Sequence, residues 1–169
     1  MERIISDATP LIYLAKANQL HLLHDMFKEI MIPNAIYDEV VVKGIQKEKN
    51  DAFRIKKMIG DGWLQVRTVR IHFQGELPLH PGETEVISLA LENGIKTVLM
   101  DDVKARTAAE MAGLIPKGTI WLLLKAVKNK ILDFDQFLVA LEEIVRSGYY
   151  LKEDVFLKAV HTAKNLSNL

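Results

Sequence analysis

Short apolar runs alternate along the chain with longer segments in which apolar residues recur at helical spacing. The run "RIISD" (3–7) predicts a strand, and the Leu and Ile spacing of "ATPLIYLAKANQLHLL" (8–23) predicts one helix after it. "EIMIP" (29–33) repeats the strand signal. "NAIYDEVVVKG" (34–44) predicts a second helix that ends at Gly44, a left-handed terminator.

The same alternation continues through the middle of the chain. Residues 46–59 predict a polar, basic helix, and "WLQVRTV" (63–69) predicts a strand after the turn at 60–62. After a loop, "HPGETEVISLALENG" (80–94) predicts a helix with Pro81 in its first turn. "TVLM" (97–100) predicts a fourth strand, and a helix follows it.

From about residue 118 the pattern is entirely helical. "GTIWLLLKAVKNK" is followed by "DFDQFLVALEEIVRSG", with Asp133 or Asp135 as its cap, and then by "YYLKEDVFLKAVHTAKNL", which starts at Tyr149. Strands that alternate with helices need crossover connections, so the sequence predicts an α/β fold with a mostly parallel sheet covered on both faces. We expect one domain over residues 1–169, with an α/β core at about 1–125 and C-terminal helices at about 126–169.

Composition narrows the choice of function. Lys and Arg total 22, as do Asp and Glu, so no overall charge recruits nucleic acid. The absence of Cys excludes disulfides, thiolate metal sites and cysteine nucleophiles, and suits a reducing cytoplasm, where we expect the protein. No apolar run is long enough to cross a membrane, so we expect no membrane partner.

Acidic residues follow two of the predicted strands. Asp7 follows the first and Asp101 the fourth, and ligands of open α/β sheets gather outside the carboxyl ends of the strands. A turn or helix cap is the alternative role for Asp7. Asp101 and Asp102 point to opposite sides, so one can serve a site while the other caps the next helix; we assign Asp101 to the site and Asp102 to the cap.

Two further acids are selected by helical geometry. Glu83 and Glu85 lie about 200° apart on a helix, and Glu83 shares its face with apolar residues that pack on the sheet. Glu83 is therefore the site candidate, although a Glu in a first turn also suits the helix dipole, and Glu85 remains an alternative. In the helix after Pro33, Glu39 lies at the edge of the apolar stripe and Asp38 is expected to face water.

Four segments in this order resemble the PIN-domain superfamily of metal-dependent nucleases, and most closely its prokaryotic branch related to the toxin ribonucleases of toxin–antitoxin pairs. The segments are "ISDATPLIYLAKA", "IPNAIYDEV", "PGETEVISLALENG" and "VLMDDVKARTAAEMAGL". The resemblance implies a PIN-like three-layer α/β/α fold with a helical C-terminal tail. It also implies a crevice in which Asp7, Glu39, Glu83 and Asp101 are catalytic residues and metal ligands.

The resemblance also covers single residues beside the four acids and the partners of the protein. Thr9 matches a small polar residue near the metal or phosphate, and Arg106 matches a basic residue after the paired acids, so both are candidate substrate-binding residues. Asp102 and Glu85 are expected either to replace Asp101 and Glu83 as ligands or to support those ligands without contacting the metal. The family's third acid is often Asp, whereas this chain has Glu83. Family members also suggest a small antitoxin protein and a homodimer as partners.

Hard oxygen donors without Cys or clustered His favour Mg²⁺ or Mn²⁺ as cofactor. One or two such ions could activate a water for attack on an RNA phosphodiester. Together with this chemistry, the resemblance implies a metal-dependent endoribonuclease, and more specifically the toxin of a toxin–antitoxin pair. The alternative is a non-catalytic PIN-fold module that binds RNA or protein. A phosphatase of the haloacid-dehalogenase type is disfavoured because Thr9 stands where its second Asp is needed.

Basic residues between Lys43 and Lys57, together with Arg67 and Arg70, form a candidate surface for RNA phosphates. The other interpretation is a solvated helix face with internal ion pairs.

Overall fold

The computed structural model describes residues 2–168. Its five strands form one sheet in the order β3-β2-β1-β4-β5, and every neighbouring pair is parallel. The strands are β1 (Glu2–Ser6), β2 (Phe27–Pro33), β3 (Gln65–Arg67), β4 (Thr97–Leu99) and β5 (Ile115–Lys117). The parallel α/β architecture predicted from the sequence is therefore confirmed.

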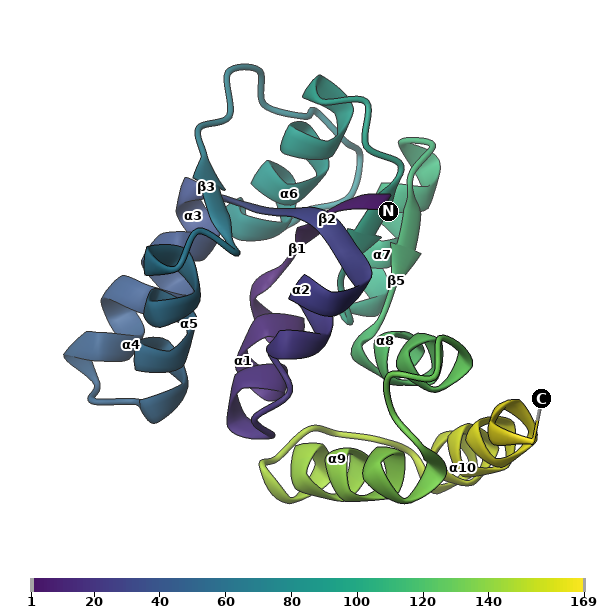
Figure 1. Ribbon diagram of the computed structural model, residues 1–169. Coiled ribbons are helices and arrows are strands. Elements are labelled where there is room, and N and C mark those ends of the chain that lie inside the picture. Colours follow the sequence, from purple (N-terminus) through teal and green to yellow (C-terminus); the bar gives the residue numbers. More distant parts are fainter. Residues whose placement is uncertain (1, 169) are drawn as a thin grey trace.

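Helices connect the strands and continue beyond the sheet (Figure 1). They are α1 (Ala8–Lys16), α2 (His21–Met26), α3 (Asn34–Tyr37), the π-helical turn η1 (Asp38–Val42), α4 (Lys43–Gln46), α5 (Asn50–Gly60), α6 (Pro81–Glu92), α7 (Val103–Met111), α8 (Thr119–Lys128), α9 (Phe134–Arg146) and α10 (Glu153–Ser167). α6 packs on β1, β2 and β4, and α2 packs on β2 from the other side, which gives three layers.

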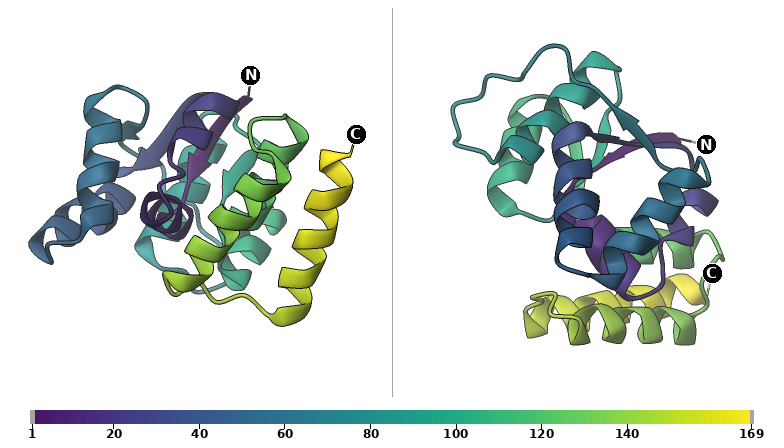
Figure 2. Two further views of the ribbon diagram at one scale, coloured as in Figure 1. Left: turned by 60° about the horizontal axis from the view of Figure 1, so that its bottom comes forward. Right: turned by 90° about the vertical axis from the view of Figure 1, so that its left-hand side faces the viewer.

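The last three helices form a unit next to α1. α8 packs against α9 and α10, and both α8 and α9 contact α1 (Figure 2). Capping is clear for α9, because the Asp133 carboxylate accepts the Gln136 amide at 2.8 Å, which selects Asp133 over Asp135. The contacts of α8 and α9 with α1 place the C-terminal helices beside the helix that directly follows Asp7.

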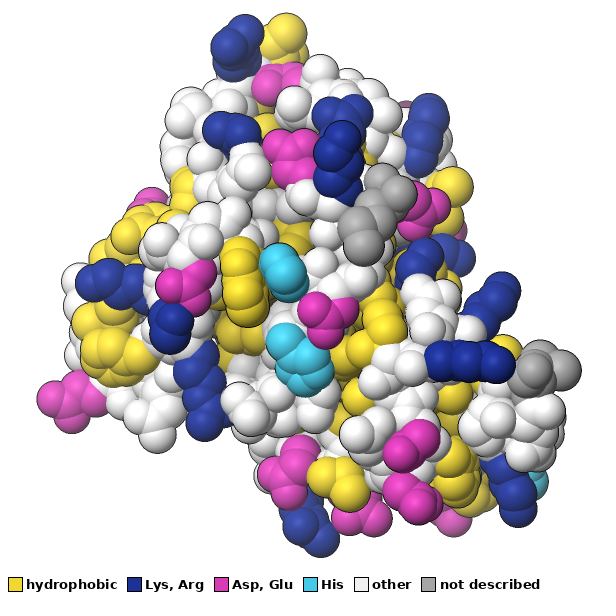
Figure 3. Space-filling model, viewed as in Figure 1, with side chains coloured by type: hydrophobic (Ala, Val, Ile, Leu, Met, Phe, Trp, Pro, Cys, Tyr) yellow, Lys and Arg dark blue, Asp and Glu magenta, His cyan; other side chains and the backbone are white. Residues whose placement is uncertain are grey.

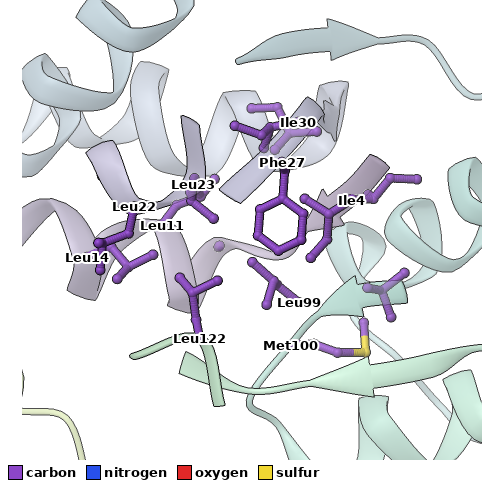
Figure 4. Close-up of a cluster of buried hydrophobic side chains, with 14 of the residues drawn as sticks. Ile4, Leu11, Leu14, Leu22, Leu23, Phe27, Ile30, Leu99, Met100 and Leu122 are labelled. Atoms are coloured by element: carbon purple, nitrogen blue, oxygen red, sulfur yellow. The ribbon is translucent and has the colours of Figure 1, made fainter. Parts of the chain in front are cut away.

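The core lies between the sheet and these helices. Phe27, Ile4 and Leu99 meet from adjacent strands, and Leu122 of α8 approaches them from below (Figure 4). All four side chains are almost fully buried. Burying side chains of this size contributes roughly 1.5–3 kcal/mol each. Because β1 is the middle strand, its end is held from both sides.

Several predicted boundaries are wrong. The helix predicted over 8–23 is split, because Asn18 adopts φ 57°, a left-handed conformation that Asn tolerates, and α2 starts anew at His21. The helix predicted to end at Gly44 continues to Gln46. Gly44 lies inside it and is needed for close packing, since a Cβ there would stand 2.6 Å from the Ala52 Cβ.

Two other differences bear on the site. β5 was not predicted, because its three residues include Pro116, which strands tolerate mainly at sheet edges. The last helix begins at Glu153 rather than at Tyr149, so Tyr149 lies in the loop between α9 and α10.

Candidate functional site

Asp7 and Asp101 lie at the carboxyl ends of two adjacent strands. Asp7 directly follows β1, and Asp101 is two residues beyond Leu99, the last residue of β4. The chain builds β2 and β3 on one side of β1 and β4 and β5 on the other, so the two acids flank the switch point where open α/β sheets bind ligands. The Asp7 amide donates to the Leu99 carbonyl oxygen at 2.8 Å, which ties the two strand ends together.

Asp7 is buried, with 6% of its surface exposed. It occupies the N-cap position of α1, yet its carboxylate makes no capping hydrogen bond, so the cap interpretation does not account for the side chain. Burial raises the pKa of Asp7 from 3.8 to about 7. The Ala8 amide opposes this rise, whereas the carboxylates of Glu83, Glu39 and Asp101 add to it.

Because the carboxylates of Glu83, Glu39 and Asp101 all contribute to the pKa of Asp7, the four predicted acids lie in one neighbourhood. Glu39 lies in η1, and wide helical turns of this kind are frequent at functional sites. Its Oε2 atom is 3.6 Å from the point where a Cβ on Gly82 would stand, which places it against the first turn of α6. Glu83 lies in that same turn, where its Oε2 accepts the His80 amide at 2.9 Å.

Protein donors hold Asp101 tightly. Thr119, at the start of α8, donates its amide to Oδ1 at 2.8 Å and its hydroxyl to Oδ2 at 2.6 Å. The Tyr149 hydroxyl donates to Oδ1 at 2.8 Å. Gly118 makes this approach possible, because a Cβ there would stand 2.8 Å from Asp101 Oδ1.

The structure separates the members of both acidic pairs. The Asp102 carboxylate accepts the Ala105 amide at 2.9 Å and caps α7, which confirms the predicted cap. The site role of Asp101 stays a prediction. Glu85 Oε2 accepts the Ala35 amide at 2.9 Å, at the start of α3. The second acid of each pair thus supports a helix start.

The two candidate substrate-binding residues also lie near these acids. Thr9 is in the first turn of α1, two residues beyond Asp7, and is half-buried. Arg106 is half-buried on α7, and its Nη1 atom is 3.1 Å from the point where a Cβ on Gly118 would stand, the same point that Asp101 Oδ1 approaches. A substrate-binding role for either residue stays a prediction.

A cavity of about 300 Å³ opens beside this neighbourhood, between the starts of α6 and α7. Its lining includes Glu83 and Asp102 together with His80 and Lys104. At such an opening, the carboxylates can bind a phosphate ester through a divalent ion. The Lys104 ammonium can bind its oxygens directly.

No three acidic or histidine side chains within residues 2–168 converge, as they are arranged, closely enough to hold one metal ion. Two of the acids are turned toward protein donors, Asp101 toward Thr119 and Tyr149 and Glu83 toward the His80 amide. The donor set still fits Mg²⁺ or Mn²⁺, because Mg²⁺ binds through one or two carboxylates and keeps several waters. The predicted ligand roles of Asp7, Glu39, Glu83 and Asp101 stay predictions.

Sequence reasoning missed Thr119 and Tyr149. Thr119 follows the unrecognised strand β5, and a prediction of that strand would have placed it at the same sheet edge as Asp101. Tyr149 had been assigned to a helix, and nothing local marks it as a partner of Asp101. Burial, followed by the nearby Asp101 charge, raises the pKa of Tyr149, so its hydroxyl stays protonated and can donate.

Among residues 2–168, no helix has both the length and the apolar character that crossing a membrane requires. No curated protein matches the chain. A solved structure of a PilT N-terminus domain protein from the hyperthermophilic archaeon Sulfolobus solfataricus P2 is similar at 17% identity and a TM-score of 0.48, covering 75% of this chain and 93% of that one. The model of a family described as "PIN domain" matches residues 3–165. The chain therefore belongs to the PIN-domain family.

Proposed function

We propose that the protein is a metal-dependent endoribonuclease that hydrolyses RNA phosphodiester bonds at the cluster of Asp7, Glu39, Glu83 and Asp101. The observation that carries the proposal is the position of Asp7, a buried carboxylate without a capping bond at the end of β1, whose amide is bonded to the end of β4, the strand that leads to Asp101. Burial and the charges of the three other acids raise the pKa of Asp7, which agrees with this position. Keeping such a carboxylate costs stability, and a divalent cation would offset that cost. PIN domains are typically nucleases and generally use divalent metal ions.

Each residue has a distinct part in this proposal. Asp7 and Asp101 would hold a divalent ion from the ends of β1 and β4, with Glu39 of η1 and Glu83 of α6 as the further ligands. A bound Mg²⁺ or Mn²⁺ supplies Lewis-acid stabilisation of the phosphodiester and activates water. Thr9 and Arg106 contact the phosphate. The burial of Asp7 excludes bulk water from this carboxylate and would strengthen its electrostatic interaction with a bound cation.

Two basic residues of the surface predicted between Lys43 and Lys57 have partners within the protein. Arg54 donates to the Ala15 carbonyl oxygen at 2.6 Å, and Lys57 pairs with Asp61 at 2.6 Å. Space-filling views show acidic and basic side chains interspersed on one face of the molecule (Figure 3). The α5 residues are therefore a weaker RNA surface than their sequence suggests.

A groove of about 640 Å³ is a second candidate path for the RNA backbone. Its lining includes Arg3, Arg67 and Arg70, from β1, β3 and the following loop. Two of them also have partners within the protein, since Arg67 pairs with Glu29 at 3.6 Å and Arg3 donates to the Asn93 carbonyl oxygen at 3.1 Å. Glu92 is also in the lining, and its carboxylate accepts hydrogen bonds from the backbone amides of Arg70 and Ile71. Guanidinium groups bind phosphate oxygens well. None of the described residues that line the groove is aromatic and could stack on a base, so we propose that it contacts RNA without reading its sequence.

Two partners also belong to the proposal. A small antitoxin-like protein would restrain the nuclease by covering the acidic cluster. A second copy of the chain would form a homodimer. Because Phe137, Leu141 and Ile144 of α9 are buried within one chain, that contact would use other residues.

The first test compares wild type with Asp7→Asn. Mn²⁺ is titrated by calorimetry into each metal-free protein, and both are then incubated with Mn²⁺ and a mixed single-stranded RNA pool. Wild type is expected to bind Mn²⁺ and to cleave, and Asp7→Asn to lose both. Asp38→Asn is the matched control, since Asp38 is exposed and lies next to Glu39 in the same turn.

Other outcomes would change the assignment. RNA binding without cleavage at any Mn²⁺ concentration would favour a non-catalytic PIN-fold module. Cleavage that persists in Asp7→Asn would contradict the proposed site.

A further inference from the structure

Asp101 is supported by a residue from outside the α/β core. Tyr149 lies in the loop between α9 and α10, 48 residues further along the chain, and its hydroxyl donates to Asp101 Oδ1 at 2.8 Å. The Thr119 amide donates to the same oxygen at 2.8 Å, and the Thr119 hydroxyl donates to Oδ2 at 2.6 Å. These three donors come from two segments and act on one carboxylate.

The position of Tyr149 is itself supported. Its ring meets the ring of Tyr13 edge to face, with centroids 5.1 Å apart and planes at 83°. The Tyr13 hydroxyl donates to the Gly148 carbonyl oxygen at 3.3 Å. Tyr13 lies in α1, the helix that starts directly after Asp7, so one helix connects Asp7 to the residue that supports Asp101.

An ionised carboxylate offers about four acceptor positions, and three of those on Asp101 are used by protein donors. The remaining capacity suits a single bond from one oxygen to a cation. Donors that orient a metal-binding carboxylate are part of a metal site, and removing one typically costs roughly 10- to 100-fold in metal affinity or activity.

We infer that Tyr149 is a positioning residue for Asp101, so that the C-terminal helices complete the metal site of the α/β core. The inference rests on the proposed function, because it assigns Asp101 as a ligand. Tyr149 contacts neither substrate nor ion and acts through the orientation of Asp101.

A purely structural role would have a different signature. If Tyr149 only held the tail against the core, its loss would lower the melting temperature and leave metal affinity unchanged. If its hydroxyl competed with the cation for Asp101, its loss would raise metal affinity. Positioning predicts a loss of metal affinity at nearly constant stability.

The test uses Tyr149→Phe, which removes the hydroxyl and keeps the ring against Tyr13. Tyr150→Phe is the matched control, because Tyr150 is the neighbouring residue and is 82% exposed. Mn²⁺ affinity is measured by calorimetry on the full chain, and melting temperatures are recorded without metal. We expect about tenfold weaker Mn²⁺ binding for Tyr149→Phe and unchanged binding for Tyr150→Phe. Unchanged or tighter binding in Tyr149→Phe would overturn the inference.

A second variant covers the case in which Tyr149→Phe loses stability. Thr119→Val removes the other hydroxyl donor to Asp101, and the double variant is compared with the two single ones. Because both donors act on one carboxylate, we expect the two effects on Mn²⁺ affinity to be non-additive. Additive effects would show that Tyr149 does not act through Asp101.

RNA cleavage separates this inference from the proposed function. Wild type that binds Mn²⁺ without cleaving RNA, with weaker binding in Tyr149→Phe, would overturn the nuclease and keep the positioning role. Wild type that cleaves RNA, with unchanged Mn²⁺ affinity in Tyr149→Phe, would do the reverse. Wild type that binds no Mn²⁺ would overturn both.

Discussion

Glu85 Oε2 accepts the backbone amide of Ala35 at 2.9 Å, so a side chain of α6 satisfies the start of α3. Ser88 and Glu92 lie on the same face of α6 and act similarly, since Ser88 accepts the Phe73 amide and Glu92 the Arg70 and Ile71 amides. This face therefore holds neighbouring backbone in place, whereas Glu83 lies on the side of Asp7.

The two glutamates of "GETE" should respond differently to substitution. Glu85→Ala leaves the Ala35 amide without its acceptor and should lower the free energy of unfolding by about 1–2 kcal/mol, with metal affinity retained. Glu83→Gln keeps an oxygen for the His80 amide and removes the charge, so it should weaken Mn²⁺ binding and cleavage at nearly unchanged stability. Urea denaturation and calorimetry measure both. The opposite pattern would exchange the two assignments.

The paired aspartates offer a similar contrast. Asp102→Ala removes the N-cap of α7 and should cost about 1 kcal/mol of stability while RNA cleavage persists. Asp101→Asn keeps the shape of the side chain and removes its charge, so cleavage should be lost. Assays of both variants at one temperature, well below both melting points, keep the stability effect out of the activity comparison.

Asp7 predicts how stability depends on pH. Its folded pKa of about 7 lies above its ordinary value of 3.8, so the folded protein holds this proton more tightly and stability falls as pH rises through that window. At about 1.4 kcal/mol per pKa unit, a shift of this size corresponds to a few kcal/mol.

Asp7→Asn removes that titration, so the metal-free variant should gain stability over wild type between pH 4.5 and pH 8. Urea denaturation in a chelator at three pH values tests this. Parallel pH profiles for the two proteins would show that Asp7 does not titrate in this window. Added Mn²⁺ at pH 8 should then stabilise wild type and leave Asp7→Asn unchanged.

Gly118 tests the packing around Asp101. A Cβ at this position would lie 2.8 Å from Asp101 Oδ1 and 3.1 Å from Arg106 Nη1, so Gly118→Ala should displace the carboxylate and weaken Mn²⁺ binding. Gly44→Ala is a useful comparison because its Cβ would meet Ala52, remote from the acids, and overpacking there should cost about 1–3 kcal/mol of stability. Equal Mn²⁺ affinity in both variants would contradict this account of Gly118.

The arginine groove predicts a change in salt dependence. Arg67→Ala with Arg70→Ala, made in the Asp7→Asn background to prevent cleavage, should lower the slope of log affinity against log salt by about 1.4 if two phosphate contacts to single-stranded RNA are lost. Fluorescence anisotropy of a labelled RNA measures it. Lys158→Ala with Lys164→Ala on α10 removes the same charge and should leave the slope unchanged.

The sequence alone was sufficient for the elements with strong local patterns. Periodicity placed β1, β2, β4 and α6, and the alternation of strands and helices predicted the parallel sheet, because each of these depends on residues close together in the chain. It also assigned the cap of α7 to Asp102, since neighbouring residues at a strand end must point apart and a cap depends on local sequence.

Tertiary contacts decided the rest. Gly44 continues a helix because of its packing against Ala52, and β5 pairs as an edge strand despite Pro116. The partners of Asp101 at positions 119 and 149 meet it only once β5 and the C-terminal helices are in place. Local propensity specifies which segments become helices and strands, but burial and hydrogen bonding between distant segments determine which side chains meet, and no pattern within a short window contains that information.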